Sequence, residues 1–196
     1  MESKTPKLEL LRRIIQEVNT ARNLDAALAT MVRRIRKAMR TDVCSFYLYD
    51  AEHDELVLME TIGLHSQAVG QVILETGEGL VGLVAEREEP LNLEEAHAHP
   101  RFLYFAETGE ERYSSFLGVP IIHQRRMLGV LVVQQADKRR YDEEDEAFLI
   151  TLGAQLAGVL AHALATGSIS KPTQPGRQAM FTGVAASPGM AIGEVV

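Results

Sequence analysis

Phe116-Leu-Gly-Val-Pro-Ile-Ile122 and Met127-Leu-Gly-Val-Leu-Val-Val133 are two apolar runs separated by the polar turn His123-Gln-Arg-Arg126. β-Branched and large apolar residues dominate both runs, and such residues fit a pleated, buried surface. The second run contains no polar residue, so a strand formed by it must be covered on both faces. We therefore predict a β-hairpin at the centre of a sheet, with helices on at least one side.

The flanking sequence extends this hairpin into one α+β domain. Helical spacing predicts a helix over 6–18 and a second helix that begins at Asn23 or Asp25 and ends near Met39. Alternation over 43–49 and 56–62 predicts another hairpin, with Cys44, Phe46 and Leu48 on one face. Short strands over 71–74 and 90–93, and helices over 80–87 and 143–164, complete a mainly antiparallel sheet with helices.

Composition excludes several classes of protein. The 196 residues are 46% hydrophobic and 24% charged, which is typical of a globular chain. A net charge of -7 argues against a nucleic-acid-binding protein, and a single Cys excludes a disulfide framework and favours the cytoplasm. The charged N-terminus is unlike a signal peptide, and no apolar run approaches the ~20 residues of a membrane span.

Three motifs match patterns of functional sites, but the sequence around each of them argues against that function. Gly77-Glu-Gly-Leu-Val-Gly82 matches G-x-G-x-x-G, but it follows a short strand and Glu78 would repel a pyrophosphate. His97 and His99 are too few ligands for a metal site, so we predict no metal. Cys44 lies among apolar neighbours without a partner thiol, which indicates an inert core residue.

Residues 94–115 form a long segment with little periodicity, and such segments inside compact domains are often lids or binding loops. We expect a small amino or keto acid to bind between this segment and the sheet. Arg112 is the candidate for its carboxylate, with pairing to Glu110 or Glu111 as the alternative. Glu107 could hold an ammonium group. The remaining candidates are hydroxyl groups and residues at the start of the short helix: Ser45, Tyr47, Thr61, Leu80, Val81, Ser114 and Ser115.

The helix predicted over 143–164 carries a face of small residues that permits close approach, either to the domain's own sheet or to a second copy. That face contains Gly153, Ala154, Ala157, Gly158 and Ala161. We predict a homodimer through the terminal helices. Beyond the helix, residues 166–180 have the composition of a linker, and residues 181–196 are too short to form a core.

The order of elements resembles a GAF domain, and the motifs that sharpen the likeness are Gly79-Leu-Val-Gly82, Pro90-Leu-Asn-Leu93, Phe116–Ile122 and Leu128–Gln135. Together they resemble the N-terminal GAF domain of the nitrogen phosphotransferase-system enzyme I, a phosphoenolpyruvate–protein phosphotransferase. The likeness implies that residues 1–165 are a GAF sensor domain with the terminal helices on one face of the sheet and a loop-covered ligand pocket on the other. Gly183-Val-Ala-Ala-Ser-Pro-Gly189 then resembles the start of the next, phosphotransfer domain.

The resemblance also implies a role in nitrogen regulation, with glutamine or 2-oxoglutarate as the signal and the phosphocarrier protein NPr as partner of the full-length protein. The family's phosphorylated histidine belongs to a segment that is not present here, so we expect no phosphotransferase activity from these residues. Phosphoenolpyruvate and Mg²⁺ are expected only for the missing domains, and no cofactor is expected here.

Two other classes compete with a small-molecule sensor. One is a dimerisation scaffold without a ligand. The other is an enzyme, of which the GAF reductases of free methionine sulfoxide are the example, but those use several cysteines and this chain has only Cys44. Cyclic nucleotides are disfavoured because Gln135-Ala136 stands where that family has Asn-Lys, and bilin attachment because 94–115 has no cysteine.

Overall fold

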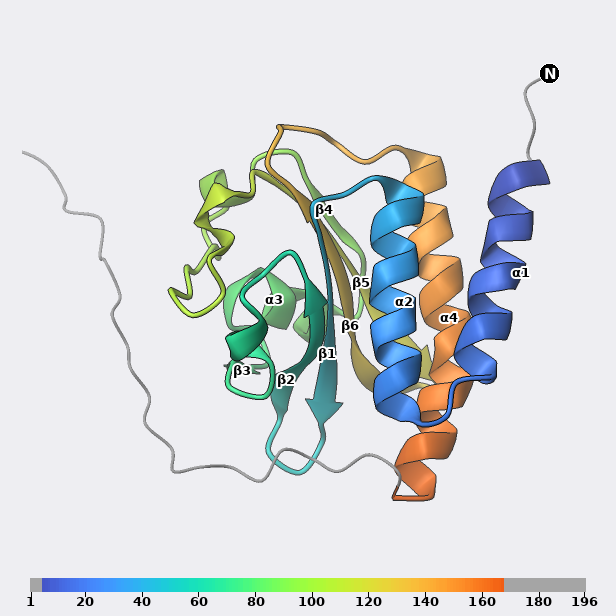
Figure 1. Ribbon diagram of the computed structural model, residues 1–196. Coiled ribbons are helices and arrows are strands. Elements are labelled where there is room, and N and C mark those ends of the chain that lie inside the picture. Colours follow the sequence, from blue (N-terminus) through green and yellow to red (C-terminus); the bar gives the residue numbers. More distant parts are fainter. Residues whose placement is uncertain (1–4, 168–196) are drawn as a thin grey trace, which may run out of the picture.

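The computed structural model describes residues 5–167. The predicted linker, apart from its first residues, and the predicted start of a further domain at 181–196 lie outside this range. Within it, helices pack on one side of a single sheet, and α3 (Gly79–Arg87) and a long connecting segment cover the far side of the sheet, as Figure 1 shows. This is the predicted α+β architecture.

The described part of the chain contains one antiparallel sheet with the strand order β3-β2-β1-β6-β5-β4. The strands are β1 (Val43–Asp50), β2 (Glu55–Ile62), β3 (Ile73–Glu75), β4 (Leu91–Leu93), β5 (Ser115–His123) and β6 (Arg126–Gln135). The predicted 116–135 hairpin is therefore β5–β6, and its second strand lies at the centre of the sheet beside β1. β5 lies one strand from the edge, because the short β4 pairs with it.

The turn of this hairpin explains its register. His123 pairs with Arg126, which leaves a two-residue loop of Gln124 and Arg125. Both loop residues have positive φ angles, 47° and 66°. A two-residue turn with positive φ at both positions twists in the same sense as the strands, so it joins them without splaying the sheet.

Two helices, α2 (Leu24–Met39) and α4 (Glu143–Ala165), cover one face of the sheet, and α1 (Thr5–Asn19) packs on the outer side of these two helices (Figure 1). Asn23 caps α2 by accepting a hydrogen bond from the Ala26 backbone at 2.9 Å, which decides between the two predicted starts. Cys44, Phe46 and Leu48 of β1 point into this core, as the alternation predicts. Burial raises the pKa of the Cys44 thiol far above its usual range, consistent with an inert core residue.

Helix α4 begins where predicted, since Asp142 accepts a hydrogen bond from the Asp145 backbone at 2.8 Å. Its small-residue face is divided between two environments. Gly153 and Ala157 are buried, and a Cβ at Gly153 would meet Ile121 of β5 at 3.5 Å. Gly158 has nothing within 4 Å of such a Cβ. The buried part of the face therefore packs on the domain's own sheet.

By length and apolar composition, α4 is the one helix within residues 5–167 that could cross a membrane. Core helices of globular domains meet the same two criteria. Here Leu149, Leu152, Leu156 and Leu160 are buried against the sheet and the other helices. This packing favours a core helix of the domain.

The opposite face of the sheet is covered by α3 (Gly79–Arg87) and by residues 94–114, which we call the covering segment (Figure 1). The covering segment contains two short 3-10 helices, η2 (Ala96–Ala98) and η3 (Glu110–Arg112), and a third, η1 (Ser66–Ala68), follows β2. A second apolar cluster fills this side. Its sheet residues include Tyr47, Leu56, Leu58, Phe116, Val130 and Val132.

Candidate functional site

A small cavity lies on the side of the sheet opposite α2 and α4, between the sheet, the start of α3 and the covering segment. Its volume is about 20 Å³, and a cavity of roughly 10–15 Å³ is enough for one water molecule. Three of the candidate residues line it, namely Leu80 and Val81 of α3 and Tyr47 of β1. The other lining residues are Leu74, Gly79, Phe102, Leu103, Phe105, Glu110, Phe116 and Gln134. We call this space the Glu110 cavity.

Three polar side chains face this otherwise apolar space. Gln134, which is 4% exposed, donates its Nε2 proton to Oε2 of Glu110 at 3.4 Å. Tyr47 is 3% exposed, and within residues 5–167 its hydroxyl has no hydrogen-bond partner. A few polar groups in an apolar cavity are the usual design of a small-molecule site.

Burial changes the acidity of two of these groups. Desolvation raises the pKa of Glu110 to about 7, although hydrogen bonds from Gln134, the Phe105 backbone and Thr108 favour the charged form. Burial also raises the pKa of Tyr47 well above its usual range, and the nearby Glu110 adds to this effect. Perturbed carboxyl groups in a cavity mark candidates for a functional site.

The covering segment is held next to Glu110 by one contact within the segment and by contacts to His65. The hydroxyl of Thr108 donates to the Phe105 carbonyl at 2.7 Å, and the backbone N–H of His65 donates to the Thr108 carbonyl at 3.0 Å. Gly109 has a φ of 67°, and a Cβ there would come within 2.7 Å of the His65 ring. The contacts to His65 hold the residues just before η3, and with them Glu110, against the connection that follows β2.

The predicted hydroxyl groups fall into two sets. Ser45 and Thr61 lie on the same face as Tyr47, but they hydrogen-bond to each other at 2.7 Å and do not line the cavity. Ser115 shares its side of β5 with Leu117, so its buried side chain points toward the helices and donates to the Gln135 carbonyl at 3.4 Å. Ser114 is partly exposed and does not line the cavity either.

The two charged side chains that were predicted to bind the ligand lie at the surface. Glu107 and Arg112 are both exposed, and neither lines the cavity. The guanidinium of Arg112 lies over the ring of Tyr113, 5.5 Å from its centroid. Sequence reasoning considered Glu110 only as an ion-pair partner and passed over Gln134. The strand period could have found Gln134, because it shares a face with Val130 and Val132.

The two histidines considered as metal ligands, His97 and His99, make other contacts. The ring of His97 packs on Phe102 with centroids 4.7 Å apart, and the Arg101 backbone donates to His99 Nδ1 at 3.2 Å. Asp50, Glu52 and His53 do gather at the β1–β2 turn with ligand atoms within 4.8 Å. There, Asp50 and His53 already contact each other at 2.9 Å, as an exposed turn commonly arranges.

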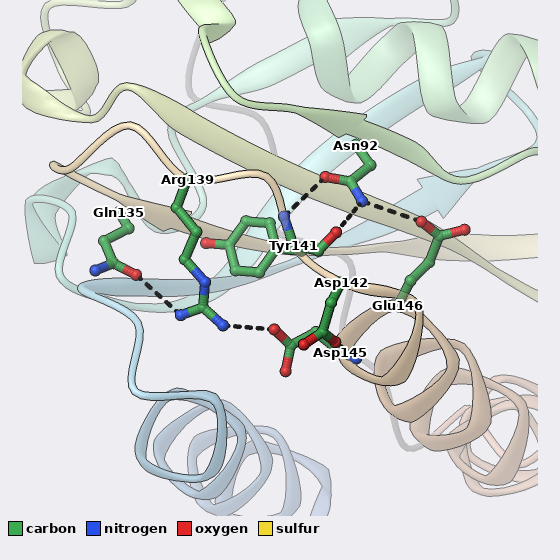
Figure 2. Close-up of polar contacts among 7 residues, drawn as sticks. All are labelled: Asn92, Gln135, Arg139, Tyr141, Asp142, Asp145 and Glu146. Atoms are coloured by element: carbon green, nitrogen blue, oxygen red, sulfur yellow. Dashed lines mark hydrogen bonds and ion pairs between the residues drawn. The ribbon is translucent and has the colours of Figure 1, made fainter.

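A second polar cluster joins the sheet edge to the start of α4 (Figure 2). Asn92 of β4 donates to the Tyr141 carbonyl at 2.9 Å and accepts from the Tyr141 N–H at 3.3 Å. Its amide also donates to Glu146 at 3.1 Å. Arg139 pairs with the mostly buried Asp145 and lies over the Tyr141 ring, 5.0 Å from its centroid. The amide, guanidinium and carboxylate groups of this cluster pair with one another, which indicates a structural role, whereas the buried Tyr141 hydroxyl has no hydrogen-bond partner within residues 5–167.

The sequence and the fold correspond to a known family. Residues 23–160 match the GAF domain family. The chain belongs to the GAF domains.

Within this family, the chain is similar to the GAF domains of phosphoenolpyruvate–protein phosphotransferases. The GAF domain of that protein from Coxiella burnetii is 48% identical, with a TM-score of 0.81 over 86% of this chain and 100% of the other. The corresponding domain from Acinetobacter is 46% identical, with a TM-score of 0.78 over the same shares.

A curated relative from Escherichia coli K12, described as a phosphoenolpyruvate-dependent phosphotransferase system protein, is 44% identical over 187 residues. The match covers 95% of this chain and 24% of the relative. The chain therefore spans about a quarter of the length of the curated relatives it matches.

Proposed function

We propose that this GAF domain is the regulatory small-molecule sensor of a phosphoenolpyruvate–protein phosphotransferase of the nitrogen phosphotransferase system. Its ligand reports nitrogen status, and glutamine and 2-oxoglutarate are the two candidates. The observation that carries the proposal is the Glu110 cavity, where a desolvated carboxyl group, a buried amide and an unpaired phenol meet under the covering segment. The similarity to the phosphotransferase GAF domains supports the regulatory context.

The rest of the proposed system follows from that context. The full-length protein acts in the cytoplasm and passes its phosphoryl group to the phosphocarrier protein NPr. Phosphoenolpyruvate and Mg²⁺ serve the phosphotransfer domains, and this domain adjusts their activity.

Ligand binding requires the covering segment to move. A cavity of about 20 Å³ holds roughly one water molecule, which is far less than an amino acid occupies. Leu103 and Tyr104 on this segment are exposed large side chains, 44% and 49% accessible, so the segment packs less tightly than the sheet below it. Opening would enlarge the cavity without disturbing the strands.

The small cavity also supports the alternative, a dimerisation scaffold without a ligand. Thermal unfolding with millimolar glutamine or 2-oxoglutarate distinguishes the two functions. A ligand at a hundred times its dissociation constant stabilises the fold by about 2.7 kcal/mol, which raises the melting temperature by roughly 5–10 °C. No shift with any small nitrogen metabolite would favour the scaffold. We expect the shift to survive Arg112→Ala, because the Arg112 side chain is exposed.

A further inference from the structure

We propose that the Glu110 cavity recognises a primary ammonium group, either the free ammonium ion or the amino group of a small amino acid. The inference deepens the proposed function and rests on it, since it names the chemistry that the sensor site selects. It also chooses between the candidate signals, because glutamine carries such a group and 2-oxoglutarate does not.

The charges around the cavity support this choice. Among the lining residues of the described chain, Glu110 is the one charged group, and no lysine or arginine is present. The charge of Glu111 beside Glu110 raises the pKa of Glu110. Glu110 in turn raises the pKa of Tyr47 from β1 and of Tyr104 from the covering segment. All of them are acids. A dicarboxylate placed here would meet a carboxylate without a countercharge, whereas a cation would supply the missing one.

The hydrogen-bonding capacity points the same way. A primary ammonium group has N–H donors and no acceptor. Glu110 offers carboxylate oxygens, the Tyr47 hydroxyl is unpaired within residues 5–167, and Gln134 keeps its Oε1 free when its Nε2 donates to Glu110. Tyr47 and Gln134 reach the cavity from the neighbouring strands β1 and β6, and Glu110 reaches it from η3 in the covering segment.

Size and aromatic lining complete the fit. The volume of about 20 Å³ suits a group of the size of a water molecule, and an ammonium group has that size. Phe102, Phe105 and Phe116 line the same space, and the faces of aromatic rings attract cations. A free ammonium ion fits the closed cavity, whereas an amino acid needs the covering segment to open.

Proton linkage provides a readout that a purely structural Glu110 would not give. The pKa of Glu110 is raised to about 7, so the carboxyl group is largely protonated below that pH. A cation binds its ionised form, which releases the proton. Affinity for an ammonium group should therefore fall by about tenfold per pH unit below 7.

The experiment is calorimetric titration and thermal unfolding of the 196-residue chain at pH 6 and pH 8. The probes are ammonium chloride, glutamine and 2-oxoglutarate, with sodium chloride and tetramethylammonium chloride as controls at equal ionic strength. The variants are Glu110→Gln, which keeps the shape and removes the charge, and Glu111→Gln, which removes a neighbouring exposed charge.

We expect ammonium or glutamine at ten times its dissociation constant to raise the melting temperature by about 3–6 °C at pH 8. Glu110→Gln should weaken that ligand at least tenfold, and Glu111→Gln should change its affinity less than twofold. If glutamine binds at least tenfold tighter than ammonium, the source is the amino acid; comparable or weaker binding identifies the free ion.

Three results would overturn the inference. Binding of 2-oxoglutarate alone, or amine binding that Glu110→Gln leaves unchanged, would reject it while the sensor function stands. An equal shift with tetramethylammonium would reject N–H recognition. Absence of any shift with all three metabolites would reject the inference and the proposed function together.

Discussion

Two glycines of this chain differ sharply in how much space surrounds them. A Cβ at Gly129 in β6 would lie 2.2 Å from the Tyr47 carbonyl oxygen and 2.9 Å from the Phe46 ring, whereas one at Gly158 in α4 would meet nothing within 4 Å. We predict that Gly129→Ala lowers the free energy of unfolding by about 2–3 kcal/mol, because β1 and β6 must separate.

Gly158→Ala is the matched substitution, and it should raise the free energy of unfolding by about 0.5–1 kcal/mol, because alanine restricts the unfolded chain and favours the helix. Urea unfolding measures both. If the two variants are equally stable, the central strands tolerate displacement and the close approach of β1 to β6 does not limit stability.

Glu110 makes stability depend on pH. Its pKa is about 7 in the folded chain and about 4.5 when unfolded, so the folded state holds the proton more tightly. The stability linked to that proton is fully present below about pH 4.5 and is lost as the pH rises through about 7. Glu110→Gln removes this dependence, and we predict that it stabilises the chain by at most about 3 kcal/mol at pH 8.

Urea unfolding of the wild type and Glu110→Gln at pH 5, 6, 7 and 8 measures the difference between them. The difference should be small at pH 5 and should grow through pH 7. A difference that stays constant across this range would show that the Glu110 carboxyl group is solvated.

At the scale of elements, the edge strand β4 is held by side-chain contacts as well as by its ladder with β5. Asn92 bonds both backbone groups of Tyr141 and the Glu146 carboxylate (Figure 2). We predict that Asn92→Ala lowers the free energy of unfolding by about 2 kcal/mol. The backbone amide of Tyr141 should then exchange with solvent about 10–30-fold faster, since it loses its acceptor.

The control is Glu146→Gln, which keeps an oxygen that accepts from Asn92 and should cost less than about 1 kcal/mol. Hydrogen exchange followed by NMR measures the Tyr141 amide in both variants. Equal protection of Tyr141 in the wild type and Asn92→Ala would mean that the start of α4 is held without β4.

At the scale of the whole molecule, the predicted homodimer depends on the face of α4 that does not pack within the domain. Gly153 and Ala157 are buried in the domain, but Ile150, Ala154 and Gly158 are exposed at spacings of four residues and lie on one side of the helix. We predict association through this side at tens of micromolar chain. Light scattering should then give twice the 21.7 kDa of one chain.

Ile150→Glu should dissociate this dimer because it places a charge in an apolar interface. Ile73→Glu is the matched control, since Ile73 is similarly exposed, 36% against 40%, but lies on β3. A monomeric wild type at these concentrations, or dissociation by the control as well, would contradict the role of α4.

The sequence by itself determined the elements and their order. Strand alternation correctly assigned Cys44, Phe46 and Leu48 to the helical core, and the caps Asn23 and Asp142 lie at the helix starts. These features are local: a period of two residues sets the faces of a strand, and a side chain near its own helix satisfies the first N–H groups. The motifs around the β5–β6 hairpin were also enough to indicate the family, which the comparison confirms.

Only the tertiary structure decided which side chains meet in the cavity. The covering segment has no period, so the direction of Glu107, Glu110 and Arg112 could not be inferred from their spacing, and packing turned Glu110 inward while the other two stayed exposed. Gln134 reaches Glu110 across 24 residues of sequence. Such a contact depends on how a loop lies on a sheet, which is set by the packing of the whole chain and by no pattern along it.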